Sequence, residues 1–175
     1  EETIHFPDGL KDYITYLMSN KVSITQEFFV GSNIFPDQQG RLEWALAWPD
    51  EDEAYIRTYC NTIPTPLGGT HENGFRSAIT KAIREYAERT GYKKANQITA
   101  EDVWGGAYGL LSVFIKDAQF QGQTKDKLVT PAVARLVENA IKDLFDLWLG
   151  EHRDDAALLL DYVVGRVEER LNRKK

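Results

Sequence analysis

Two short glycine-containing segments of this 175-residue chain stand out from ordinary loops, and the second could bind a phosphate. Residues 68–76 read Gly-Gly-Thr-His-Glu-Asn-Gly-Phe-Arg, and the glycines permit backbone angles that other residues avoid. In the second segment, residues 119–125, Gly122 permits a sharp turn, Gln123 offers an amide donor and Lys125 carries a mobile charge with three donors. The second segment could therefore hold a terminal phosphate, although composition alone favours ordinary loops at both places.

Other residue types that carry chemistry give no comparable pattern. Cys60 follows Tyr59 in a predicted strand, and we expect it to be a buried core residue. The acidic pairs at 101–102 and 154–155 are expected to cap helices, because negative charge favours the positive end of the helix dipole. Three histidines lie far apart, without the spacing of metal ligands: His5, His71 and His152. We therefore predict neither a metal site nor a catalytic residue in this chain.

The composition describes a folded protein whose charge is unevenly spread. Hydrophobic residues make up 42% and aromatic residues 11%, which excludes a mainly disordered chain. The net charge of -6 argues against a simple nucleic-acid-coating protein. Bases nevertheless outnumber acids in residues 76–94 and again in residues 166–175. Each basic island predicts either a solvated helix face or contact with a polyanion.

Cysteine content and apolar segments bear on the compartment. A single cysteine rules out an intramolecular disulfide and fits a reducing environment. No apolar run approaches about 18 residues and no leader precedes the chain, so we expect no membrane segment and a cytoplasmic protein. Because the first residue is Glu1 rather than Met, we expect a piece of something longer.

The first half of the chain predicts one helix and three strands. The helix covers residues 7–20, and a strand at 28–30 ends at Gly31. Residues 42–48 alternate with period two, which is typical of a half-buried strand. We expect residues 54–60 to pair with that strand in an antiparallel hairpin.

Helices dominate the predicted second half. A loop over 61–73 leads to a helix over 75–87, whose outward face would carry Arg76, Thr80, Lys81 and Arg84. A capping box at 99–102 opens a short helical turn.

The rest of the chain predicts a strand and two long helices. Residues 110–115 read as a strand that is buried on both faces, and a polar loop covers 117–128. Thr130 and Pro131 begin a helix that Gly150 ends. The last helix runs from Asp154, and its charged second half is expected to leave the core.

Two motifs, taken in order and about fifty residues apart, resemble the B subunit of bacterial type IIA DNA topoisomerases. They are Gly-Gly-Thr-His with Gly-Phe-Arg, over residues 68–76, and Gln-Thr-Lys, over residues 123–125. The resemblance covers nearly the whole chain and corresponds to the transducer domain of the ATPase region. Four further stretches are closer to topoisomerase IV than to gyrase: 44–48, 61–65, 100–104 and 147–149. Gyrase-like chains usually carry Arg-Glu-Gly-Leu where this chain has Trp-Gly-Gly-Ala at 104–107, so no role is transferred from that tetrad.

The resemblance implies an α+β fold like domain 2 of ribosomal protein S5, with a left-handed βαβ crossover. Residues 1–150 would form the transducer domain, and residues 151–175 a C-terminal helix that leads toward the DNA gate. Gln123 and Lys125 would contact the γ-phosphate of ATP. Most of the ATP pocket and the Mg²⁺ would belong to an N-terminal domain outside this chain, so the chain alone would not hydrolyse ATP.

The resemblance also implies a role and partners. The chain would couple ATP binding and hydrolysis to DNA strand passage, decatenation and relaxation, on the bacterial chromosome. Its partners would be DNA, the A subunit of an A2B2 heterotetramer and a second B subunit. The family arginine at Arg76 would face the cavity that DNA crosses, with Lys81 and Arg84 on the same helix face.

Two alternatives stay open. One is the transducer of a gyrase B subunit, which negative supercoiling by the assembled enzyme would indicate. The other is a non-catalytic nucleic-acid-binding module with the S5-like fold, which tight, salt-sensitive DNA binding by this chain alone would support.

Overall fold

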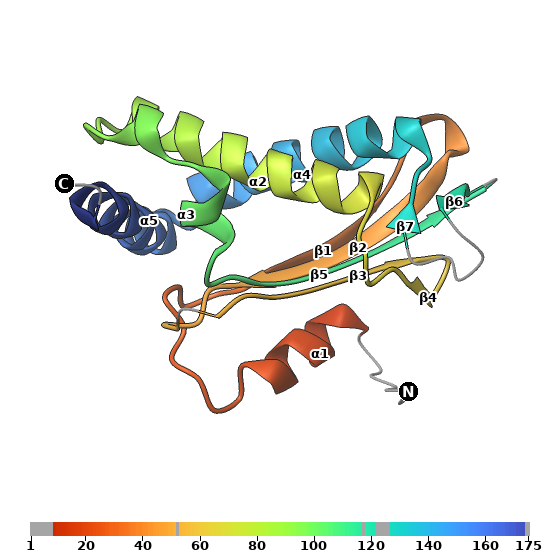
Figure 1. The fold of residues 1–175 in the computed structure, drawn as a ribbon, viewed down its shortest axis with the longest axis horizontal. Coiled ribbons are helices and arrows are strands. Elements are labelled where there is room, and N and C mark those ends of the chain that lie inside the picture. Colours follow the sequence, from red (N-terminus) through yellow and green to blue (C-terminus); the bar gives the residue numbers. More distant parts are fainter. Residues whose placement is uncertain (1–8, 52, 117, 122–126, 174–175) are drawn as a thin grey trace.

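The computed structural model describes residues 9–51, 53–116, 118–121 and 127–173. A mixed five-stranded sheet with the order β1-β2-β5-β3-β4 lies between α2 and α4 on one side and α1 on the other (Figure 1). The strands of this sheet are β1 (Phe29–Ile34), β2 (Gly40–Ala47), β3 (Tyr55–Cys60), β4 (Ile63–Pro64) and β5 (Tyr108–Ile115). A separate two-stranded sheet pairs β6 (Phe120–Gln121) with β7 (Lys127–Leu128). The helices are α1 (Leu10–Leu17), α2 (Thr70–Arg89), α3 (Ala100–Trp104), α4 (Pro131–Glu151) and α5 (Arg153–Arg173), with 3₁₀ turns at Pro36–Gln38 and Ala95–Gln97.

The predicted hairpin between residues 42–48 and 54–60 is wrong. β5 lies between β2 and β3, antiparallel to β2 and parallel to β3. Residues 108–113 of β5 are buried, whereas 114 and 115, the end of the strand predicted as buried, are half-buried. Burial on both faces is typical of a strand in the interior of a covered sheet. The long connection through α2 and α3 supplies the crossover that a parallel pair of strands requires.

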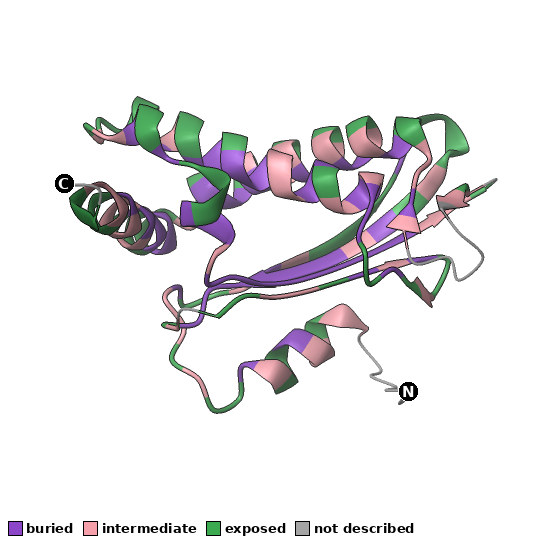
Figure 2. Ribbon diagram, in the orientation of Figure 1, coloured by how far each residue is buried: buried purple, intermediate pink, exposed green. Residues whose placement is uncertain are grey.

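Both faces of the central strands are covered. Leu42, Trp44 and Leu46 of β2 are buried in the larger core, as their alternation predicts. The opposite face is not solvated, because Ile14 and Met18 of the first helical segment cover it and bury small side chains of β2 (Figure 2). The second half of β2 is therefore buried on both faces rather than half-buried.

Two strand and helix ends differ from the prediction. β1 continues through Gly31 to Ile34, and a Cβ at Gly31 would lie 2.8 Å from the ring of Trp44. This glycine therefore admits a neighbouring indole instead of ending the strand. α4 continues past Gly150 to Glu151.

α2 begins earlier than predicted. It starts at Thr70, so residues 70–76 of the first glycine-containing segment are helical. Thr80 is buried rather than outward, and its hydroxyl donates to the carbonyl of Arg76 at 2.8 Å. α2 runs alongside α4 above the sheet (Figure 1).

The charged half of α5 does not leave the core, contrary to the expectation. Val163 and Val167 are fully buried, and Arg170 is ion-paired with Asp102 of α3. At the start of α5 the buried carboxylate of Asp155 accepts the backbone N–H groups of residues 26 and 27, at 2.6 and 3.1 Å. The helix is thus fixed at both ends, and the α+β class is confirmed.

Candidate functional site

The polar loop predicted over 117–128 is held at its base by a short hairpin. β6 pairs with β7, Val129 N donates to the carbonyl of Gln119 at 2.8 Å, and Gln119 N donates to the hydroxyl of Thr130 at 2.8 Å. Thr130 stands before Pro131 as predicted, but its hydroxyl accepts from the loop instead of capping α4. Gln123 and Lys125 lie outside the described residues, so the structure gives the anchorage of their loop and leaves their role a prediction.

The base of this loop is joined to the first glycine motif. Leu128 N donates to the carbonyl of Gly68 at 3.0 Å, and Gly69 forms a parallel bridge with Leu128. Gly69 has φ 135°, and a Cβ there would lie 2.1 Å from the carbonyl oxygen of Leu128. Only glycine permits this approach. The base of the loop that carries the second motif therefore meets the first motif at the start of α2.

A buried polar cluster follows immediately in the first turn of α2. His71 is fully buried, and its Nε2 lies 3.0 Å from Oγ1 of Thr65. The Thr65 hydroxyl lies 2.8 Å from that of Thr58 on β3, which in turn donates to Glu72 at 3.3 Å. Burial lowers the pKa of His71 to about 4, so the ring is neutral at physiological pH. Sequence reasoning overlooked this cluster, although a histidine beside two glycines at a helix start is a usable signal.

Arg76 lies one turn further along α2 and is paired. Its Nε donates to Glu72 at 3.0 Å, and its guanidinium lies 5.5 Å from the ring centre of Trp104. Trp104 Nε1 in turn donates to the carbonyl of Arg76 at 3.2 Å. The Arg76 side chain is 39% exposed, so it reaches solvent while being held by α3.

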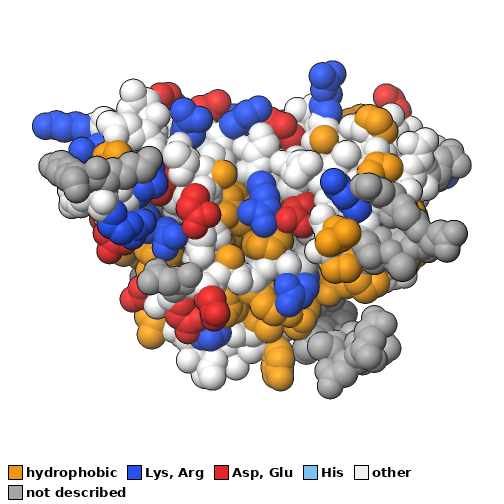
Figure 3. All heavy atoms as spheres, in the orientation of Figure 1, with side chains coloured by type: hydrophobic (Ala, Val, Ile, Leu, Met, Phe, Trp, Pro, Cys, Tyr) orange, Lys and Arg blue, Asp and Glu red, His pale blue; other side chains and the backbone are white. Residues whose placement is uncertain are grey.

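The other cations predicted to face DNA lie on the outer side of α2. Lys81 is exposed and ion-paired with Glu138 of α4, and Arg84 is exposed. A second ion pair, Lys142 with Glu85, joins the same two helices at 2.7 Å. Basic and acidic side chains are interspersed over the face in Figure 3. The basic island of the sequence is thus partly neutralised by acids that come from outside it.

In the described part of the chain, little supports a metal site, a reactive cysteine or catalysis by the acidic pairs. There, no three His, Cys, Asp or Glu side chains are placed to hold a metal ion. Cys60 is fully buried, as predicted, and burial raises the pKa of its thiol to about 11. Of the two acidic pairs, Glu101-Asp102 supplies a capping box with Thr99 as predicted, whereas Asp155 binds the loop at residues 26–27. No helix among the described residues is both long and apolar enough to cross a membrane.

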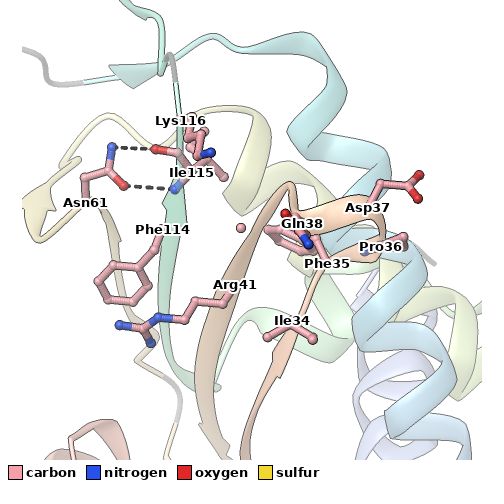
Figure 4. Close-up of a pocket in the computed structure, with 11 residues that line it drawn as sticks. Ile34, Phe35, Pro36, Asp37, Gln38, Arg41, Asn61, Phe114, Ile115 and Lys116 are labelled. Carbon is pink, nitrogen blue, oxygen red and sulfur yellow. Dashed lines mark hydrogen bonds between the residues drawn. The ribbon is translucent and has the colours of Figure 1, made fainter.

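An open groove of about 810 Å³ lies at the end of the sheet that carries the β1–β2 turn. Its walls are mainly apolar, with Ile34 and Phe35 on one side and Phe114 on the other (Figure 4). Arg41 stacks over the Phe114 ring at 3.9 Å, and Asn61 exchanges two hydrogen bonds with the backbone of Ile115. Of the predicted site residues, the three that the structure describes, Arg76, Lys81 and Arg84, do not line this groove.

A family model described as DNA gyrase B matches residues 9–175. The chain belongs to the DNA gyrase B family. This membership confirms the resemblance to the B subunit of bacterial type IIA topoisomerases that the two motifs indicated.

Relatives in this family place the chain near topoisomerase IV. It is 49% identical, over its whole length, to the B subunit of DNA topoisomerase 4 from Bartonella bacilliformis and covers 25% of that protein. It is 46% identical to the protein of the same name from Caulobacter vibrioides, again over its whole length and 26% of the relative. The chain therefore spans about a quarter of the length of these curated relatives.

Solved structures give the same fold. The chain resembles the topoisomerase IV ATP binding domain of Francisella tularensis with a TM-score of 0.81 and 32% identity, over 97% of this chain and 45% of that one. It also resembles the 43K ATPase domain of Thermus thermophilus gyrase B with a TM-score of 0.85 over 95% of this chain and 44% of that one. At 24% identity, the second likeness shows the fold alone.

Proposed function

We propose that this gyrase B family chain is the transducer portion of a topoisomerase IV B subunit. In the whole protein, an ATP-hydrolysing isomerase, it would couple ATP binding and hydrolysis to DNA strand passage. The observation that carries the proposal is the junction at Gly69 and Leu128, which ties the base of the Gln123–Lys125 loop to the start of α2. The finer classification, a fold like domain 2 of ribosomal protein S5 with a left-handed crossover, belongs to the same proposal.

The chemistry of the loop fits a phosphate. Gln123 and Lys125 offer an amide donor and an ammonium group, and a charge-assisted contact contributes roughly 1.5–3 kcal/mol. Such a contact exists only while the γ-phosphate is present, so its loss would release the loop from the nucleotide. Because the loop base is hydrogen-bonded to Gly68, a displacement of the loop would exert a pull on the start of α2.

The remaining nucleotide contacts would come from outside the chain. ATP chelates Mg²⁺, and the described residues hold no cluster of three metal ligands. As the family resemblance implies, most of the ATP pocket and the metal ligands would belong to the segment preceding this chain. The A subunit, a second B subunit in an A2B2 heterotetramer, and a cytoplasmic, chromosome-associated setting complete the proposal.

Lys125→Ala in the full-length B subunit, in complex with the A subunit, tests the loop assignment. We expect ATP turnover under subsaturating ATP to fall roughly 10- to 150-fold, the rate equivalent of the lost contact. Lys127→Ala is the matched control, because it removes the same charge from β7 at the base of the same loop. Full turnover in Lys125→Ala, or an equal loss in both variants, would contradict the assignment.

Arg76, Lys81 and Arg84 are the proposed DNA-facing cations. Their support is position, since all three reach solvent along α2, although Arg76 and Lys81 are also paired with glutamates. Replacing Arg84 and Lys81 with Gln should weaken DNA stimulation of ATP turnover more at low salt than at high salt, because released counterions drive phosphate contacts. A loss independent of salt concentration would argue against phosphate contact.

The family model, described as DNA gyrase B, favours one second candidate, a gyrase transducer. The assembled enzyme decides between the two: ATP-dependent introduction of negative supercoils into relaxed plasmid would indicate gyrase. Decatenation and relaxation without negative supercoiling would indicate topoisomerase IV.

A further inference from the structure

Arg170, in the last turns of α5, is bound to α3 by a forked contact. Its Nε donates to Oδ1 of Asp102 at 3.1 Å and its Nη2 donates to Oδ2 at 2.9 Å. The same Nη2 donates to the carbonyl of Gln97 at 2.8 Å. The guanidinium thus uses several of its donors on one site, which a lysine could not reproduce.

The acceptor in this contact is buried and rigid. Asp102 is only 2% exposed, and its Oδ2 also accepts the backbone N–H and the hydroxyl of Thr99 in the capping box. Burial alone would raise the pKa of this carboxyl, but the hydrogen bonds from Arg170 and Thr99 outweigh it and lower the pKa below its usual value. Asp102 is therefore a fixed anchor with its charge retained.

α3 is itself joined to α2 on its other side. Trp104 donates to the carbonyl of Arg76, and its ring lies 5.3 Å from that of Phe75 in an edge-on arrangement. α3 thus forms a short block between the helix that begins at the loop junction and the helix that ends the chain.

Two glycines let α5 approach this block closely. A Cβ at Gly105 would lie 2.2 Å from Nη2 of Arg166, and a Cβ at Gly106 would lie 2.6 Å from the hydroxyl of Tyr162 and 2.5 Å from the carbonyl oxygen of Glu51. These glycines belong to the Trp-Gly-Gly-Ala stretch at 104–107, where the sequence departs from the gyrase pattern. Their missing side chains leave the space that Arg166 and Tyr162 of α5 occupy.

We propose that Arg170 is a positioning residue that fixes the direction in which α5 leaves the domain, acting through Asp102. The inference rests on the proposed function, because a fixed exit helix matters only if motion of this chain is passed onward. Beyond Val167, α5 is held by the Arg170 fork and by half-buried Leu171, which packs against the core, whereas the remaining described side chains there are exposed. Without the fork, the end of α5 would detach, and movement that begins at the loop junction would not reach the segment that follows.

The coupling test uses the full-length B subunit in complex with the A subunit. For Arg170→Leu we expect kcat and KM of DNA-free ATP hydrolysis to stay within about twofold of wild type, while the ATP consumed per decatenated circle rises at least about fivefold. Arg170→Lys should recover part of the coupling. Arg173→Leu is the matched control, because it removes the same charge from an exposed position on the same helix. Unchanged coupling in Arg170→Leu, equal uncoupling in Arg173→Leu, or a parallel fall in DNA-free hydrolysis would each overturn the proposal.

A distance measurement separates this inference from the proposed function. Spin labels on cysteines introduced at the exposed positions Glu88 and Asn172 report the distance between the C-terminal ends of α2 and α5, while Cys60 is buried away from the label. We expect one narrow distance distribution in wild type and in Arg173→Leu, and a broad one in Arg170→Leu. An equally narrow distribution in Arg170→Leu would refute the positioning role, whether or not the assembled enzyme passes DNA strands.

Discussion

The neutral, buried ring of His71 predicts a specific loss of stability in acid. The ordinary pKa of 6.5 in the unfolded chain falls to about 4 in the folded one, because burial disfavours the charged form. The stability of the folded chain is therefore unaffected by titration of His71 above the unfolded pKa. It decreases as the pH falls from about 6.5 toward 4, because protonation of the ring favours the unfolded chain. Within that range, the unfolded chain binds one proton more than the folded chain, so each pH unit costs about 1.4 kcal/mol. Between pH 7 and pH 5, linkage gives a loss of about 2 kcal/mol.

The test compares urea unfolding of the wild-type chain and of His71→Gln at pH 7 and pH 5. Other groups titrate in both chains, so the informative quantity is the difference between the two unfolding free energies. Glutamine keeps a partner for Thr65, and the variant should be less stable at pH 7. The difference in unfolding free energy between wild type and His71→Gln should shrink by about 2 kcal/mol at pH 5, since only the wild type loses stability through protonation of His71. His152→Gln is the control, because that ring is only half-buried. A constant difference between wild type and His71→Gln at the two pH values would refute the reasoning.

Three further predictions concern groups whose surroundings are equally defined. Gly69→Ala should destabilise the chain by more than about 1 kcal/mol, and by more than Gly91→Ala. Both glycines have positive φ, but only a Cβ at Gly69 would collide with another backbone segment. Equal urea midpoints in the two variants would rule out the clash. Asp155→Asn should cost about 1–3 kcal/mol in urea unfolding, because the buried carboxylate accepts two backbone N–H groups and one of them loses its charged acceptor, whereas the exposed neighbour Asp154→Asn should cost little. The Cys60 thiol should react with Ellman's reagent about a hundredfold more slowly in the folded than in the unfolded chain, since its pKa is raised from 9.0 to about 11; rapid labelling of the folded chain would disprove its burial.

Local patterns predicted much of the secondary structure, and the reason is physical. The alternation in 42–48 and the Thr99–Asp102 box depend on neighbours within a few residues; the strand and the capping box are confirmed, although the strand is not half-buried as predicted. Strand pairing depends on residues far apart in the chain, so the sequence offered no means of placing β5 between β2 and β3. The packing of α1 against β2 could not be predicted either, because alanines fit a solvated and a covered face of a strand alike.

The candidate site, too, was predictable in part from the sequence and in part not. The motif residues could be named by resemblance, and the glycines at 68 and 69 indicated special backbone angles. A glycine indicates that something approaches closely, but the approaching group, Leu128, lies about sixty residues away and carries no signal of its own. The acid partners of the basic island were hidden likewise, since Glu138 comes from α4 and reaches Lys81 only after the helices pack.

The contacts of α2 explain how one short loop could influence a distant end of the molecule. Its first turn is bonded to the loop base, its middle is joined to α3 through Trp104, and its whole length packs along α4. His71 and Phe75 are fully buried, so the first turns of α2 cannot shift without opening the core. A displacement imposed at the loop junction is therefore resisted by this packing. The sheet and the helices would instead rotate together as one body. In the proposed function, the hinges then lie outside this body, and Arg170 decides whether the last turns of α5 rotate with it.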